Sequence, residues 1–278
     1  MHKLSFILYI IFVLVLKETL LSAQDLNEIK RHEDSLKIIV QVISATQDDS
    51  LKLLLNKKFS VLLDSTLTNL LSFEYPFDSL KSLGKLTSPD KRFRMYLWAL
   101  HMNDGSYHNF GFIQQPKPFR PEIIALSDRS DSIENPEIMI LQPDNWYGAL
   151  YYKIIPVKTA SGTYYTLLGW FGNNSVVTQK IIDVLSFNSD GLAIFGARVF
   201  NHYAQGENTR IIFRYSAQTS MMLKYDKQMI VFDRLIPLDA QLEGLYQHYV
   251  PESDVYDGLN LEYGKWNFVK GIKGLNKH

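Results

Sequence analysis

The stretch that decides the fold is KRFRMYLWALHMNDGSYHNFGFIQQ, which runs from Lys91 to Gln115. In its first part, residues 92–101, the even-numbered residues Arg92, Arg94, Tyr96, Trp98 and Leu100 alternate with Phe93, Met95, Leu97, Ala99 and His101. A period of two is typical of a β-strand. Asp104 and Gly105 follow, and this dipeptide readily adopts the positive φ angles of a type I′ turn. The stretch therefore predicts a β-hairpin with a two-residue loop, in which Tyr107–Gln115 is the returning strand.

The same period continues toward the C-terminus. Further strand candidates are residues 122–126, 137–141, 147–157, 163–171, 179–187, 192–200, 210–215, 221–225, 229–235, 259–263 and 265–269. Short connections between such strands favour an antiparallel meander over βαβ units. Tyr147–Val157 is apolar on both faces, so we expect it to lie between layers. Residues 89–278 are therefore predicted to form a mainly β domain, an antiparallel meander folded into a sandwich or a barrel-like body.

The part of the chain before residue 89 has a helical period instead. Apolar residues recur every three or four positions from Leu26 to Ile43 and again from Leu51 to Leu71. Asp48 lies between the two stripes and can cap the second helix. We expect residues 24–88 to form a helical hairpin that packs on the β body, with a further short helix over Pro76–Leu83.

The N-terminus has the layout of a secretory signal peptide. Lys3 precedes the stretch Leu4–Leu16, which is apolar apart from Ser5, and the small residue Ala23 stands where a signal peptidase would cut. As a helix this stretch rises only about 20 Å, which is short of the hydrocarbon core of a bilayer at about 30 Å. Residues 1–23 are predicted to be a cleaved signal peptide and the protein to be exported, periplasmic or extracellular, without later membrane insertion. Retention of the Leu4–Leu16 helix as an anchor is the alternative.

Composition excludes several classes of function. The chain has no cysteine, so disulfides, thiolate nucleophiles and zinc–thiolate sites are impossible. Its 29 basic and 29 acidic residues leave it nearly neutral, which argues against nucleic acid as a partner. The sequence also lacks the serine elbow, the zinc-protease motif, the phosphate-binding loop and the dinucleotide fingerprint. No cofactor is predicted.

Six segments together resemble an uncharacterised family of secreted proteins from Bacteroidetes-type bacteria. They are Tyr75–Leu80, Ser88–Arg94, Trp146–Tyr152, Lys180–Phe187, Met229–Asp233 and Tyr256–Gly258. The resemblance spans nearly all of the mature chain and implies export in a bacterium with two membranes. It implies no catalytic or binding residues.

Two groups of side chains suggest metal sites. With a two-residue loop at Asp104-Gly105, His101 and His108 would face each other on one side of the hairpin and could share a metal. Asp254 and Asp257 offer oxygen ligands of the type that calcium prefers, but their spacing does not follow the EF-hand rule. Solvated histidines and turn-forming aspartates are the alternative interpretation of both groups.

Two further features concern ligands and catalysis. Trp146 and Tyr147 follow a loop-forming segment, where an exposed ring could stack on a ligand. Asp183 lies among apolar residues, and the alternation of the strand predicts that its side chain points to solvent. Glycoside hydrolysis needs a pair of carboxylates, and the sequence cannot pair Asp183 with another acid.

These observations favour a non-enzymatic exported binding or scaffolding protein of the bacterial envelope. Its predicted partners are a glycan, a peptide or an envelope protein. The alternative is a secreted hydrolase acting on glycans or peptides.

Overall fold

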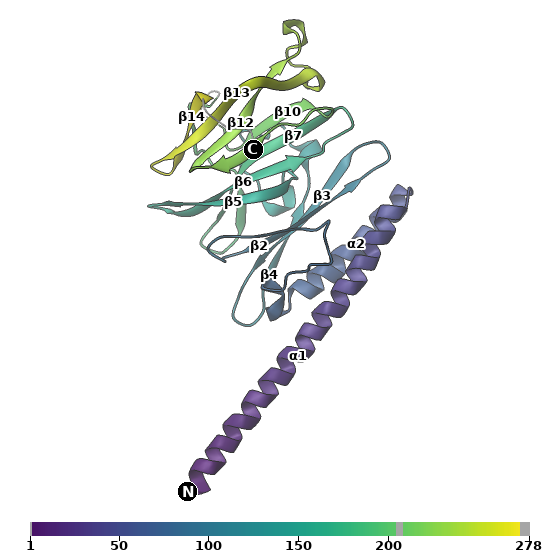
Figure 1. The fold of residues 1–278 in the computed structure, drawn as a ribbon, viewed down its shortest axis with the longest axis vertical. Coiled ribbons are helices and arrows are strands. Elements are labelled where there is room, and N and C mark those ends of the chain that lie inside the picture. The colour runs from purple at the N-terminus through teal and green to yellow at the C-terminus, as the bar shows by residue number, and fades with distance from the viewer. Residues whose placement is uncertain (1, 204–207, 273–278) are drawn as a thin grey trace. The chain divides into compact units, whose positions relative to one another are not determined.

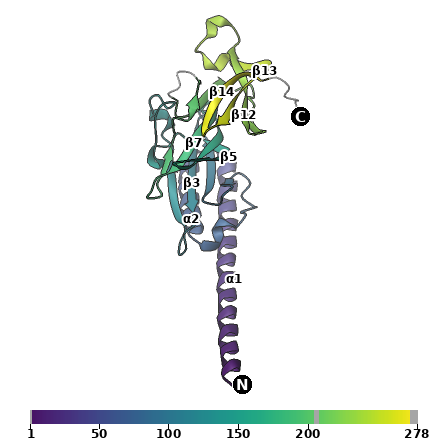
Figure 2. The same cartoon turned by 90° about the vertical axis from the view of Figure 1, so that its left-hand side faces the viewer.

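A computed structural model of the chain describes residues 2–203 and 208–272, and describes side chains from Gln24 onward. The chain divides into two compact units (Figures 1 and 2). The first comprises the residues up to Ser82 together with Gln114–Ile123, and the second comprises Leu83–Ile113 and the chain from Ile124 onward.

The first unit is built on the predicted helical hairpin. Helix α1 (His2–Ala45) and helix α2 (Asp49–Leu67) run antiparallel (Figure 1). The Asp48 side chain caps α2 by accepting hydrogen bonds from the backbone N–H groups of Ser50 and Leu51, as expected. The side chains of residues 1–23 lie outside the described ones, and signal cleavage stays a prediction.

The core of this unit comes from both helices and the segment after them. Its fully buried apolar side chains include Ile29 and Leu36 on α1 and Leu63 and Leu67 on α2. The 3-10 helix η1 (Leu70–Phe73) follows α2. Among the described residues, no helix has the length and apolarity needed to span a membrane.

The short helix predicted over Pro76–Leu83 is wrong. Phe77 has a positive φ of 52°, which a helix does not accommodate, and the segment forms turns. The buried carboxylate of Glu33 holds it in place, accepting hydrogen bonds from the Ser79 backbone at 2.8 Å and the Tyr75 hydroxyl at 2.6 Å. These hydrogen bonds to Glu33 of α1 take the place of the backbone hydrogen bonds that a helix would have made.

Fourteen strands in the described part of the chain form three sheets. The first has the order β1 (Gly84–Thr87), β2 (Arg94–His101), β3 (Tyr107–Gln115), β4 (Glu122–Ser127). The second has the order β10 (Ile211–Ser216), β7 (Val177–Phe187), β6 (Gly162–Phe171), β5 (Leu150–Thr159), with β8 (Ala193–Phe195) beside β7. The third has the order β11 (Leu223–Asp226), β12 (Met229–Pro237), β13 (Tyr249–Glu262), β14 (Lys265–Ile272), β9 (Phe200–Asn201).

The sheets of the second unit are stacked, and the second sheet is covered on both faces. Ile181 and Leu185 of β7 join a core that also contains Met95 of β2. The alternate residue Ile182 joins another core, which contains Phe232 of β12. This confirms the mainly β fold with layered strands, whereas the barrel-like alternative is wrong because the sheets do not close on themselves.

Three sequence predictions about strand positions need correction. The predicted strand 192–200 is instead two short strands, β8 and β9, which belong to different sheets. Strand β1 lies inside the segment 24–88 that was expected to be helical. The predicted strand Glu137–Leu141 is a loop apart from an isolated bridge between Leu141 and Phe195. Its carbonyls do not pair with a strand along its length: Glu137 O accepts from the Thr209 backbone at 2.7 Å and Met139 O from the Thr209 hydroxyl at 2.7 Å. Packing of the helical segment on the β body stays a prediction.

Candidate functional site

The β2–β3 hairpin has a three-residue loop instead of the predicted two-residue one. The Met102 N–H donates to Ser106 O at 2.9 Å, and the Gly105 N–H donates to Met102 O at 3.0 Å. Gly105 has a φ of 84°, the left-handed conformation that closes such a loop. The extra residue moves every pairing of the hairpin by one position.

This change of register separates the two histidines. His101 lies beside Tyr107, with ring centroids 4.8 Å apart, and no longer faces His108. Because a shift of one residue turns a side chain to the other face of a sheet, the two imidazoles line different cavities. The structure therefore does not bring His101 and His108 together as metal ligands.

The other proposed metal ligands are also apart. Asp257 is buried and accepts two hydrogen bonds from Arg234, at 2.9 Å and 2.6 Å, and one from the Gly271 backbone at 2.8 Å. Asp254 is exposed and has a φ of 58° inside strand β13, where the pairing with β12 is irregular. Within the described residues, no three histidine, aspartate or glutamate side chains are grouped so that they could hold a metal ion.

Trp146 and Tyr147 are buried rather than exposed, so the prediction of an accessible ring is wrong. The Trp146 indole N–H donates to the Tyr151 hydroxyl at 3.2 Å, and the Tyr147 hydroxyl donates to Gln179 at 2.8 Å. Both rings belong to the core between the first two sheets. A loop-forming segment before an aromatic pair does not show on which side of the chain the rings lie.

Asp183 is fully buried, contrary to the expected solvent-facing position. Its carboxylate accepts hydrogen bonds from Arg210 Nε at 3.2 Å and the Tyr151 hydroxyl at 2.9 Å. Burial and the neighbouring Asp183 charge raise the pKa of Tyr151 well above its ordinary value, so the phenol stays protonated. The Arg210 guanidinium also donates to the carbonyls of Pro136 and Met139. The cluster ties the loop after β4 to the second sheet.

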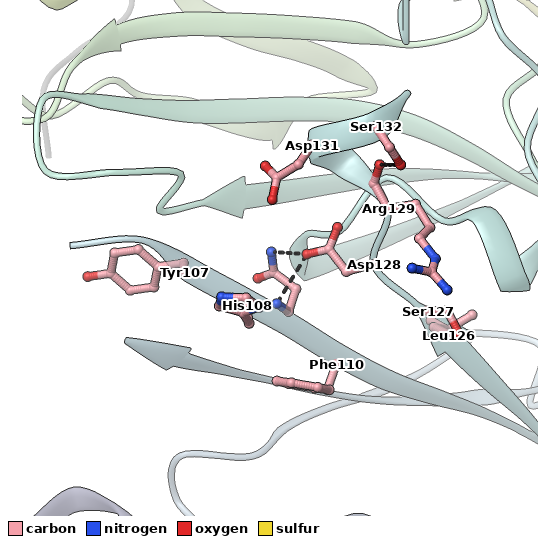
Figure 3. A pocket seen from close by; sticks show the side chains of 10 residues that line it. Tyr107, His108, Phe110, Leu126, Ser127, Asp128, Arg129, Asp131 and Ser132 are labelled. Carbon is pink, nitrogen blue, oxygen red and sulfur yellow. Dashed lines mark hydrogen bonds between the residues drawn. The ribbon is translucent and has the colours of Figure 1, made fainter. Parts of the chain in front are cut away.

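One cavity lies beside β3, at the end of β4 (Figure 3). It has a volume of about 530 Å³, within the range of small-molecule sites. We call it the Asp128 pocket, and its lining residues are Tyr107, His108, Asn109, Phe110, Leu126, Ser127, Asp128, Arg129, Asp131 and Ser132.

The two walls of the Asp128 pocket come from different segments. Tyr107, His108 and Phe110 project from β3, while Asp128 and Asp131 come from the segment after β4, which includes the 3-10 helix η2 (Ser130–Ser132) (Figure 3). His108 and Asp131 are exposed, and the two aromatic rings are half-buried. Hydrogen-bonding groups and apolar ring surface are therefore accessible together.

Asp128 organises this pocket. Its Oδ2 accepts hydrogen bonds from the Asn109 backbone at 3.1 Å and the Asn109 side chain at 2.9 Å. Its Oδ1 accepts from the Ser130 backbone at 3.0 Å and the Gly148 backbone at 3.2 Å. A Cβ atom at Gly148 would lie 2.2 Å from Asp128 Oδ2, so the close approach of the two residues requires glycine there.

Asn109 completes the wall at an energetic cost. It is 1% exposed, and its Nδ2 must face Asp128 because a carboxylate only accepts hydrogen bonds. Its Oδ1 is buried without a hydrogen-bond partner in the described part of the chain. Such a group costs about 1–3 kcal/mol, and an exception of this kind in a native fold calls for a reason.

Sequence reasoning missed Asn109, Asp128 and Asp131, although two observations pointed near them. The hairpin that contains Asn109 was predicted, and Trp146 was singled out. The Trp146 backbone does position the pocket, since its N–H donates to Ser127 O at 3.0 Å and its carbonyl accepts from the Arg129 N–H at 2.9 Å. The pairing of Asp128 with Asn109, nineteen residues earlier in the chain, has no signature in the sequence.

Comparisons with known proteins add no relative: no protein family, curated protein or solved structure matches this chain.

Proposed function

We propose that this chain is a non-enzymatic exported binding protein and that its Asp128 pocket holds a neutral sugar of a glycan. The observation that carries the proposal is the state of Asp128 itself. All four hydrogen bonds that this carboxylate accepts come from protein N–H groups, so it shapes the wall and is not available as a general acid or base.

This arrangement supports binding over hydrolysis. Glycoside hydrolysis commonly uses two working carboxylates on either side of the scissile bond. Of the two acidic residues that line the Asp128 pocket, only Asp131 is exposed. One accessible carboxylate can hold a hydroxyl group but does not complete a catalytic pair.

The accessible groups suit a sugar. Asp131 accepts hydrogen bonds, the His108 imidazole both donates and accepts, and the half-buried Tyr107 ring offers apolar surface for the C–H face of a pyranose. Within the described residues, Asn109 Oδ1 is buried without a hydrogen bond, which lowers the stability of the fold. A segment with a purely structural role could avoid this loss of stability, so the loss supports a binding role for the wall.

The test is calorimetric titration with a panel of neutral oligosaccharides built from glucose, galactose, mannose and N-acetylglucosamine. We expect one class to bind, and Asp131→Asn to weaken its binding about tenfold, since a hydrogen bond to a charged group contributes about 1.5–3 kcal/mol. Asp144→Asn is the matched control, because both aspartates are exposed and lie in the first turn of a 3-10 helix.

Two results would contradict this proposal. Release of new reducing ends from the bound oligosaccharide would show that the protein is a hydrolase. Equal affinities of the Asp131→Asn and Asp144→Asn variants would show that the ligand binds outside the Asp128 pocket.

Export rests on the N-terminal pattern and has its own test. N-terminal sequencing of the protein produced in a bacterium with two membranes should give a first residue of Gln24, as cleavage after Ala23 requires. A chain that retains Leu4–Leu16 would instead be an anchored envelope component.

A further inference from the structure

A second cavity lies in the second unit, where β6 ends, β7 begins and β10 ends, next to the tip of the β2–β3 hairpin. It has a volume of about 370 Å³ and is called here the Lys180 pocket. Its wall contains hydroxyl and aromatic groups around one lysine, and its lining residues include Lys180, Trp170, Thr178, Tyr215, Ser175 and Ser220. No acidic residue lines it among those that the structure describes.

Strand register places the main groups on one face of the second sheet. Lys180 lies directly opposite Trp170 of β6, and Thr178 lies directly opposite Tyr215 of β10. Directly opposed residues of antiparallel strands project from the same face, and so do residues two apart on one strand. The ammonium group and the indole ring therefore border the same cavity.

Lys180 has no anionic partner in the described part of the chain. Its Nζ lies 4.7 Å from the centroid of the Tyr152 ring, a cation–π contact that orients the ammonium group without neutralising it. Burial lowers the pKa of Lys180 below its ordinary value. A half-buried ammonium without a carboxylate is stabilised by an anion that enters the cavity.

The remaining groups of the wall narrow the chemistry of that anion. Lys180 supplies one fixed positive charge, which matches a carboxylate better than a phosphate monoester of charge about −2. The Ser175 and Ser220 side chains are exposed at the cavity, and Trp170 is the one tryptophan that is not buried. Hydroxyl donors and an accessible indole ring are what a sugar ring needs beside its charged group.

We propose that the Lys180 pocket binds a sugar acid, with the carboxylate on Lys180 Nζ and the ring against Trp170. This site is separate from the Asp128 pocket and carries a different ligand class, although Tyr107 lines both cavities. It goes beyond the proposed function, and its test follows a different residue.

The experiment is titration of the full chain with D-glucuronate, followed by calorimetry and by the indole N–H resonance of Trp170. We expect that resonance to shift while those of the buried Trp98, Trp146 and Trp266 stay in place. Acetate has only the carboxylate and D-glucose has only the sugar ring, so each should bind more weakly than glucuronate.

Lysine variants decide whether the ammonium group binds the ligand. Lys180→Met should weaken glucuronate binding about tenfold or more, because it removes a charge-assisted hydrogen bond while keeping the apolar contact with Tyr152. Lys153→Met is the matched control, since Lys153 lies on strand β5 of the same sheet and also contacts a tyrosine ring, with Nζ 5.9 Å from the Tyr225 centroid, but does not line the cavity.

Two outcomes would overturn the site as a whole: an unchanged affinity of the Lys180→Met variant, or no shift of the Trp170 resonance at saturating glucuronate. Acetate binding as tightly as glucuronate would overturn the assignment to a sugar.

Discussion

Two carboxylates of the second unit, Asp183 and Asp128, show how differently a fold can use the same group. Asp183 and its partner Arg210 are both completely buried, and neither lines the Asp128 pocket or the Lys180 pocket. Asp128 is only half-buried and forms the wall of a cavity of about 530 Å³. Asp183 neutralises a buried charge, whereas Asp128 orders backbone around an open space.

Beside each of these two carboxylates lies a residue with a buried polar atom that makes no hydrogen bond within the described chain. The surroundings of these two atoms also differ. Among the described residues, Arg210 Nη2 is buried without a hydrogen-bond partner, as Asn109 Oδ1 is. However, Nη2 packs against Gly196, where a Cβ atom would lie 2.8 Å from it, so no ligand can replace the missing contact. A buried polar cluster is thus evidence for a binding site only where it borders a cavity.

The largest expected effect is on the buried pair. Arg210→Met leaves the Asp183 charge uncompensated in the core and should lower the free energy of unfolding by about 3–5 kcal/mol, measured by urea denaturation. The double variant Asp183→Leu with Arg210→Met should recover much of this loss, because it removes both charges. A loss below about 1 kcal/mol for the single variant would show that the pair is not structural.

A smaller effect is expected at the wall of the Asp128 pocket. Gly148→Ala places a Cβ atom against Asp128 and should destabilise the protein by about 1–3 kcal/mol while weakening ligand binding. The same substitution in an Asp128→Ala background should cost much less, because the clashing carboxylate is gone. Equal costs in the two backgrounds would contradict the role given to Gly148.

The smallest effect concerns Asp257, a buried carboxylate whose partner Arg234 is partly exposed. Burial raises the pKa of Asp257, but the hydrogen bonds from Arg234 and the Gly271 backbone outweigh it and bring the pKa below the ordinary value of 3.8. A lowered pKa stabilises the fold above the unfolded-state value and loses this contribution as pH falls through the folded-state value. The stability difference between the parent and Asp257→Asn should therefore shrink below about pH 4.

Urea denaturation at several pH values measures that difference. A difference that stayed constant or grew on acidification would mean that Asp257 is not stabilised as a carboxylate.

The sequence predicted the architecture well because periodicity depends only on which face of an element is buried. The change of period near residue 90, the Asp48 cap and the two-sided apolar strand Tyr147–Val157 each correspond to a feature of the fold. The predicted helix at Pro76–Leu83 failed because tertiary hydrogen bonds to Glu33 override the local preference.

The sites were predicted poorly because they depend on single-residue register and on long-range pairing. One additional loop residue at Asn103–Gly105 separated His101 from His108. Asp183 could not be placed on a buried face, because a strand between two layers has no solvent side for the alternation to indicate.

Ligand binding at the Asp128 pocket is tested most directly by an NMR titration with the oligosaccharide that calorimetry identifies, following the Asn109 side-chain amide and the Arg210 Nε–H together. We expect the Asn109 resonances to shift with ligand while the Arg210 resonance stays in place. Shifts confined to Arg210, or the absence of any shift at Asn109 when the protein is saturated, would contradict a binding site at this wall.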